Sequence, residues 1–163
     1  MADITRDIRA ALESKLNNMS GIPTIAWENW TFDPPTDQSY IAPRLLFTRR
    51  EPSVTGPNPQ IYYRGVFVVD CYVPSGGQLG PSTADSLAES ILNEFEATTD
   101  IFYQPSTNSL LTEDGAYIAL ESGGRTLLDG VVNIHIRTAE REQGRTEGAF
   151  YMVPVLISWQ TYQ

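Results

Sequence analysis

The sequence predicts a single α+β domain over residues 1–163, in which a mostly antiparallel sheet carries two helices on one face and projecting β-hairpins. Three observations predict this class. Residues 61–74 alternate between apolar and polar as a strand does, and residues 82–95 then repeat apolar residues at helical spacing. Several further strand patterns accompany only one other helical pattern, at 3–17, and this ratio favours antiparallel strands with helices segregated to one face. The length suits one domain.

The strand at 61–74 has one apolar face and one mixed face. The apolar face holds Ile61, Tyr63, Phe67, Val69, Cys71 and Val73, and the mixed face holds Tyr62, Arg64, Val66, Val68 and Asp70. A period of two places these two sets on opposite sides of a sheet. Gly65 lies inside the run, where it predicts a bulge or a close backbone approach. Pro74 and the glycines after it end the strand.

Each helix shows one apolar stripe. The first, at 3–17, has Asp3 as its expected N-cap, and the second is expected to begin near Ser82, whose hydroxyl would cap free N–H groups. The stripes contain Ile4, Ile8, Ala11, Leu12 and Leu16 in the first helix, and Leu87, Ala88, Ile91, Leu92 and Phe95 in the second. Both stripes can therefore cover the apolar face of the sheet.

The remaining strands are expected at 24–28, 39–51, 127–139 and 149–163. Pro43 favours an edge position or an early bulge for the strand at 39–51, which forms a projecting hairpin with the strand at 61–74. Residues 100–108 are expected to be irregular, with short strands around Asp114-Gly115.

Two apolar features do not fit a simple two-sided sheet. The last strand is apolar on both faces, which is typical of a central strand, but Pro154 within it argues against a central place. We therefore expect an edge strand covered by a partner. Trp27, Trp30 and Phe32 are expected to hold the loop at 29–38 against the body of the domain.

The net charge of −9 is concentrated in one block. Residues 65–124 contain nine acids and no Lys or Arg, and the eleven acids outside that block match the eleven bases of the chain. This block should repel nucleic-acid phosphates. It indicates either a solvated acidic face or an acidic partner surface or channel wall.

The chain shows no pattern of a catalytic, cofactor or metal site. Cys71, the single cysteine, lies on the apolar face of its strand, where a thiol fills a core, and His135, the single histidine, lies on a polar face. Cys71 and His135 are expected on opposite faces. No nucleophile elbow, phosphate-binding lysine loop or zinc-ligand spacing occurs, and no apolar run is long enough for a membrane span. The sequence predicts a protein that is not an enzyme.

The order of several short motifs resembles the tail terminator, or tail-completion, proteins of long-tailed bacteriophages. After the first helix come Trp27-Glu28-Asn29, the strand from Arg64 to Val69, Tyr72-Val73-Pro74, Ala84-Asp85-Ser86-Leu87-Ala88, and finally Tyr151-Met152-Val153-Pro154-Val155. The resemblance covers most of the chain, and the order and spacing of the motifs carry it.

The resemblance implies a virion protein at the head–tail junction, made in the host cytoplasm. It implies a ring, expected to be a hexamer, that caps the tail tube, ends its polymerisation and joins the tail to the head connector. The expected partners are other copies of the chain, the tail tube protein, the connector or neck protein, and genome DNA passing through the lumen without sequence-specific binding. The alternatives are another neck or head-completion ring protein and a small soluble ligand-binding or enzymatic domain.

Nine residues are expected at interfaces: those at hairpin ends would contact other subunits or the tube, and Tyr62, Arg64 and Asp70 on the mixed strand face would face a neighbouring subunit or a channel. They are Arg49, Arg50, Glu51, Tyr62, Arg64, Asp70, Arg141, Glu142 and Arg145.

Overall fold

The computed structural model describes residues 4–53, 56, 59–76, 80–103 and 132–163. Two helices and seven strands follow one another along this part of the chain. Their order is α1 (Ile4–Asn17), β1 (Thr24–Ile25), β2 (Tyr40–Pro52), β3 (Ile61–Pro74), α2 (Pro81–Glu94), β4 (Asp100–Tyr103), β5 (Val132–Arg141), β6 (Arg145–Glu147) and β7 (Phe150–Tyr162). The short strands expected around Asp114-Gly115 lie outside the described residues.

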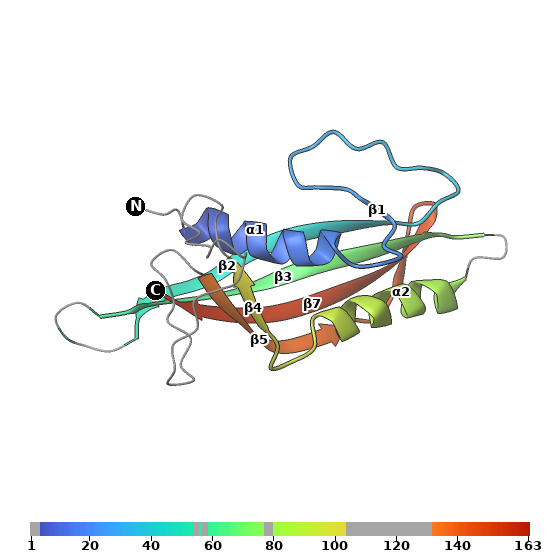
Figure 1. Cartoon of the computed structure of the whole chain (residues 1–163). Coiled ribbons are helices and arrows are strands. Elements are labelled where there is room, and N and C mark those ends of the chain that lie inside the picture. Colours follow the sequence, from blue (N-terminus) through green and yellow to red (C-terminus); the bar gives the residue numbers. More distant parts are fainter. Residues whose placement is uncertain (1–3, 54–55, 57–58, 77–79, 104–131) are drawn as a thin grey trace, which may run out of the picture.

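The strands form one sheet in the order β1-β2-β3-β7-β5-β4, with β6 paired to β7 beside this path (Figure 1). The pair β1–β2 is parallel, and the other pairings of the described strands are antiparallel. The α+β class is therefore confirmed, with a mixed sheet. The predicted strand at 24–28 is only two residues long, because the chain leaves the sheet after Ile25.

Both helices cover the same face of the sheet (Figure 1). The hydrophobic core lies between them and the strands, and it contains the predicted apolar face of β3 from Tyr63 to Val73. Ile8, Leu12 and Leu16 of α1 are fully buried there, as are Ala88 and Ile91 of α2, while Leu87 and Leu92 pack at the margin. Lys15 Nζ lies 2.7 Å from Glu94 Oε1 and links the two helices.

The start of α2 differs from the prediction. Gly80 is the N-cap, Pro81 is at the first helical position, and no side chain caps the helix. A proline fits this position because its φ is already helical and its missing N–H would have no partner in the helix. Ser82 therefore lies inside the first turn, and its carbonyl accepts a hydrogen bond from Ser86 Oγ at 2.9 Å.

Strand β7 is an interior strand, so the expected edge position is wrong. It pairs with β3 along its length on one side and with β5 and β6 on the other. The carbonyl of Pro154 accepts a hydrogen bond from Glu142 N at 2.9 Å, so the proline nitrogen also faces the β5 side. There the pairing of β5 ends at Arg141 and that of β6 begins at Arg145. The missing N–H thus falls in the break between two strands, where the ladder is already interrupted.

Strand β2 has an exposed outer edge. The carbonyl of Ile41 accepts a bond from Ala26 N at 2.7 Å on the β1 side, and Pro43, two residues on, faces that same side after β1 has ended. Among the described strands, β1 alone pairs with this edge, and it covers only Tyr40 and Ile41. A bulge lies between Phe47 and Arg49. Pro43 therefore occupies an edge position.

Two further expectations are wrong. Residues 100–103 form the strand β4 rather than irregular chain, because Ile101 packs into the core while four residues are too few to show alternation. Trp30 is 77% exposed and does not hold its loop to the domain. Phe32 does contact the domain as expected, with its ring centroid 5.0 Å from that of Tyr40.

Candidate interaction surfaces

Cys71 and His135 lie on opposite faces of the sheet, as the strand patterns predicted. Cys71 is fully buried, and burial, together with the charge of Asp70, raises the pKa of its thiol to about 12. His135 Nδ1 lies 2.8 Å from Asp100 Oδ1 at the surface, and in β5 it points away from the core that holds Cys71. Within the described ranges, no three His, Cys, Asp or Glu side chains are placed to hold a metal ion, and no helix is long and apolar enough to cross a bilayer.

The outer face, meaning the sheet face turned away from α1 and α2, carries three of the predicted contact residues. Tyr62, Arg64 and Asp70 alternate along β3 with residues of the core, so they share this face as predicted. The structure places them in two separate clusters, one near each end of β3.

Asp70 lies in a buried cluster near the end of β3. Its Oδ2 is 3.1 Å from Arg44 Nη2, and its Oδ1 has no hydrogen-bond partner among the described residues. Loss of solvation raises the pKa of Asp70, while the charges of Arg44 and Arg145 oppose that rise and Glu147 adds to it. Asp70 is only 6% exposed, so solvent reaches this ion pair through Arg44.

Aromatic rings from the chain itself cover this cluster. Tyr40 and Tyr72 stack with centroids 4.6 Å apart at 6°, and Phe150 meets both rings edge-on. Burial beside Asp70 also raises the pKa of Tyr72 to about 12. Met152 is 1% exposed on the same face. The apolar outer face of β7 is thus covered here by its own chain and not by a partner.

The second outer cluster surrounds Tyr62 and Arg64. The Tyr62 hydroxyl donates to Gln160 Oε1 at 2.7 Å and accepts a bond from Arg64 Nε. The Arg64 guanidinium lies 4.9 Å from the centroid of the Tyr62 ring. Tyr162, 53% exposed, packs its ring 4.8 Å from that of Tyr62. This cluster is open to solvent at Arg64 and Tyr162.

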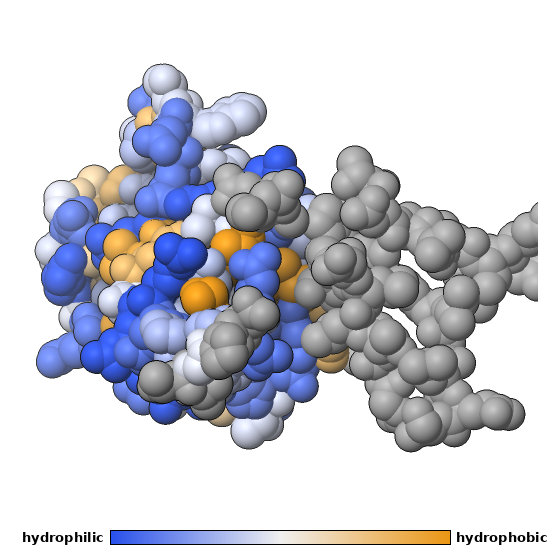
Figure 2. Space-filling model, turned by 90° about the vertical axis from the view of Figure 1, so that its left-hand side faces the viewer, coloured by the Kyte–Doolittle hydropathy of each residue, from blue (hydrophilic) through white to orange (hydrophobic). Residues whose placement is uncertain are grey.

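Arg49 and Glu51 lie beside the second cluster, because β2 pairs Arg49 with Arg64 and Glu51 with Tyr62, whereas Arg50 pairs with Tyr63 on the opposite face of the sheet. Arg49 Nη1 is 3.4 Å from Glu51 Oε1. Arg50 Nε donates to the Tyr63 hydroxyl at 3.1 Å. Leu46 and Phe47, next to them on β2, are 49% and 43% exposed. Figure 2 views the molecule from this end and shows apolar surface exposed among polar side chains.

Arg141, Glu142 and Arg145 lie at the turn between β5 and β6, away from Arg49 and Arg50. Arg141 Nη1 is 2.8 Å from Asp85 Oδ1 of α2, so its charge is paired within the chain. Arg145 is exposed, and β6 pairs it with Met152 near the Asp70 cluster. The nine predicted residues therefore form no single surface.

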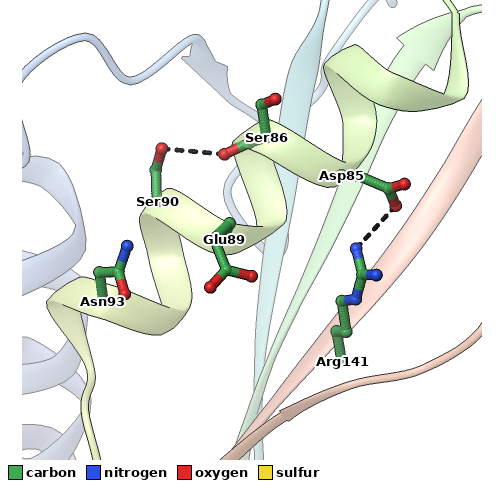
Figure 3. Close-up of a pocket in the computed structure, with 6 residues that line it drawn as sticks. All are labelled: Asp85, Ser86, Glu89, Ser90, Asn93 and Arg141. Carbon is green, nitrogen blue, oxygen red and sulfur yellow. Dashed lines mark hydrogen bonds and ion pairs between the residues drawn. The ribbon is translucent and has the colours of Figure 1, made fainter.

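Sequence reasoning missed a groove along α2. A hollow of about 390 Å³ lies between this helix and Arg141, and its lining is polar (Figure 3). The lining residues are Asp85, Ser86, Glu89, Ser90, Asn93 and Arg141. The signal in the sequence was the set of small and acidic residues on the helix face opposite the apolar stripe.

Comparison with known proteins gives one family. The family model described as "Phage tail terminator protein" matches residues 7–159. A solved structure of a protein with no descriptive name is similar at TM-score 0.62 and 21% identity, over 98% of this chain and 96% of that chain. A chain of the virion of a native gene transfer agent particle is similar at TM-score 0.54 and 10% identity, over the whole of both chains. At these identities the two structures show the fold alone. No match is found among curated proteins.

Proposed function

The chain belongs to the phage tail terminator family, and from this membership we propose that it forms a ring that caps the tail tube, ends tube polymerisation and joins the tail to the head connector. The observation that carries the proposal is the family match over residues 7–159. Membership in a family of tail structural proteins implies a non-enzymatic component of the virion.

The proposed ring is a homohexamer made in the host cytoplasm. Its partners are the tail tube protein on one side and a connector or neck protein on the other. The charge distribution supports a channel through the ring: an acidic wall repels DNA phosphates and lets the genome pass without a sequence-specific grip. The described part of the acidic block supplies exposed carboxylates at Glu96 and Asp100.

The surfaces described above support contact with other proteins. Because both helices cover the same face of the sheet, the second outer cluster and the β2 edge remain open to solvent. Exposed Leu46 and Tyr162 share the outer face with Arg49 and Arg64, and together they combine apolar, aromatic and arginine side chains. This composition is typical of the centres of protein interfaces.

The test is a polymerisation assay with the tail tube protein of the same phage. Purified chain added to growing tubes should stop elongation and appear as a ring at one tube end in negative-stain images. Bovine serum albumin at the same concentration is the control. Tubes that elongate at an unchanged rate, with no ring at their ends, would refute the proposal. Rings that bind the head connector but not the tube would instead indicate a neck protein.

A further inference from the structure

Two oppositely charged surfaces lie apart on this chain. The β2 edge, defined by exposed Leu46, Phe47, Arg49 and Arg50, carries one arginine on each face of the strand, and Glu51 Oε1 lies 3.4 Å from Arg49 Nη1. The described segment from Pro81 to Tyr103 contains the acids Asp85, Glu89, Glu94, Glu96 and Asp100 and no Lys or Arg. The strands β3 and β7 separate β2 from β5, which forms one side of the α2 groove. The two surfaces therefore cannot meet within one chain.

The β2 edge is built for side-chain contacts and not for addition of another strand. Pro43 and Pro52 bracket the exposed part of the edge, and the bulge between Phe47 and Arg49 breaks its register. Prolines, bulges and charged side chains are the devices by which natural edge strands avoid main-chain pairing. What this edge offers a partner is the guanidinium group of Arg49 with Leu46 on the outer face, and that of Arg50 with Phe47 on the face that carries α1 and α2.

The α2 groove has the chemistry to receive a guanidinium group. Arg141 already lies at its rim, with Nη1 2.8 Å from Asp85 Oδ1 (Figure 3). Glu89 lines the same groove one turn further along α2, is exposed, and has no ion-pair partner among the described residues. Ser86 and Asn93 add oxygen acceptors. Arginine pairs with carboxylates through a planar fork of donors, so this lining suits arginine better than lysine.

We propose that Arg49 and Arg50 of one copy bind in the α2 groove of the next copy, beside Glu89. The proposal rests on the ring proposed above and names the two surfaces that join neighbouring subunits. A contact between two different surfaces of the same chain is head-to-tail, and repetition of such a contact closes a ring when the rotation between copies permits. Charge complementarity selects a second copy as the occupant, because the groove is acidic and the edge is basic.

The experiment reverses the charge on each side and then on both. Arg49→Glu with Arg50→Glu places acids against the acidic groove, and Glu89→Arg places a base against the basic edge. Each variant should reduce the ring population, measured by native mass spectrometry at a fixed protein concentration, by at least about tenfold, because like charges at an interface oppose association. Combining the three substitutions restores opposite charges and should recover most of the rings.

The control is Arg137→Glu, which reverses an exposed arginine on β5 outside both surfaces and should leave the rings unchanged. Rings that persist in both single-sided variants would overturn this inference and leave the proposed terminator function standing. Loss of rings without recovery in the combined variant would overturn the assignment of the α2 groove. A wild-type chain that forms no ring would overturn both proposals.

Discussion

Gly65→Ala offers the sharpest test of the packing at the centre of the sheet. Gly65 of β3 is paired with Phe47 on one side and Trp159 on the other. A Cβ at this position would lie 2.6 Å from Trp159 Cε2, and closer still to Trp159 Cζ2 and to the carbonyl oxygen of Leu46. Carbon atoms in contact normally lie about 3.5–4.0 Å apart. The glycine is therefore required by close approach, as its place in the strand predicted.

Two effects of the substitution have opposite signs. Alanine in place of a strand glycine reduces the entropy of the unfolded chain and would by itself stabilise by about 0.5–1 kcal/mol. Overpacking a rigid core costs about 1–3 kcal/mol. Trp159 is fully buried, with the ring of Phe47 at 5.5 Å, and the second obstacle is a backbone carbonyl, so neither obstacle can move easily. We expect a net loss of about 2 kcal/mol, since overpacking at the upper end of its range outweighs the entropy gain.

Urea unfolding and thermal melting measure this loss. A decrease of about 2 kcal/mol should lower the Tm by roughly 4–8 °C in a domain of this size. All samples need one protein concentration, because subunit association adds to apparent stability. Gly56→Ala is the matched control, since a Cβ there meets nothing within 4 Å, and it should change stability by less than about 0.5 kcal/mol. A Gly65→Ala variant as stable as wild type, or more stable, would refute the described packing of Trp159 on Gly65.

Three further predictions follow from buried groups. Burial raises the pKa of Asp70 above 3.8, so the folded chain keeps the Asp70 carboxyl protonated to higher pH than the unfolded chain does. The stability that this group contributes is therefore lost as the pH rises through its pKa in the folded chain. Asp70→Asn should therefore gain stability relative to wild type as the pH rises above 3.8 in urea titrations; a pH-independent difference contradicts this. Cys71, buried with a pKa of about 12, should react with a thiol reagent at pH 8 only as fast as the chain unfolds, and rapid labelling of folded protein would show an open thiol. Phe95→Ala should cost about 3–5 kcal/mol in urea unfolding, because its ring is fully buried 5.9 Å from that of Phe67; a loss below about 1 kcal/mol would contradict the core assignment.

The sequence predicted secondary structure and buried faces correctly where the periodic hydrophobic pattern extends over many residues. The alternation in β3 and the stripe of α2 placed Phe67, Cys71 and Ile91 in the core correctly, because a side chain's face depends only on its position along its own element. The cap of α2 was wrong because Ser82 and Gly80 both fit a helix start, and Pro81 at the first position decided between them. The strand β4 was missed because its four residues give too short a pattern.

The candidate surfaces depended on information that a linear pattern lacks. The sequence placed Tyr62 and Asp70 on one strand face, but it did not show that Asp70 is buried, or that Tyr40, Tyr72 and Phe150 from three separate strands pack together. The partner of Asp70, Arg44, comes from the neighbouring strand and was not identified. Strand pairing brings these residues together, and pairing between distant segments is not encoded in local spacing.

The interior position of β7 changes where contacts between subunits should be sought. A strand apolar on both faces suggested a partner on its outer face, but Met152 and Pro154 on that face are buried within the chain itself. The exposed apolar side chains Leu46 and Phe47 lie instead on β2. Beyond Ile41, none of the described strands pairs with the outer edge of β2. A chain that covers its own sheet face but leaves arginines and apolar side chains exposed at one edge is expected to bind other proteins through that edge. Assembly should therefore respond to substitutions at Arg49 and Arg50 far more than to substitutions on the outer face of β7 near Met152.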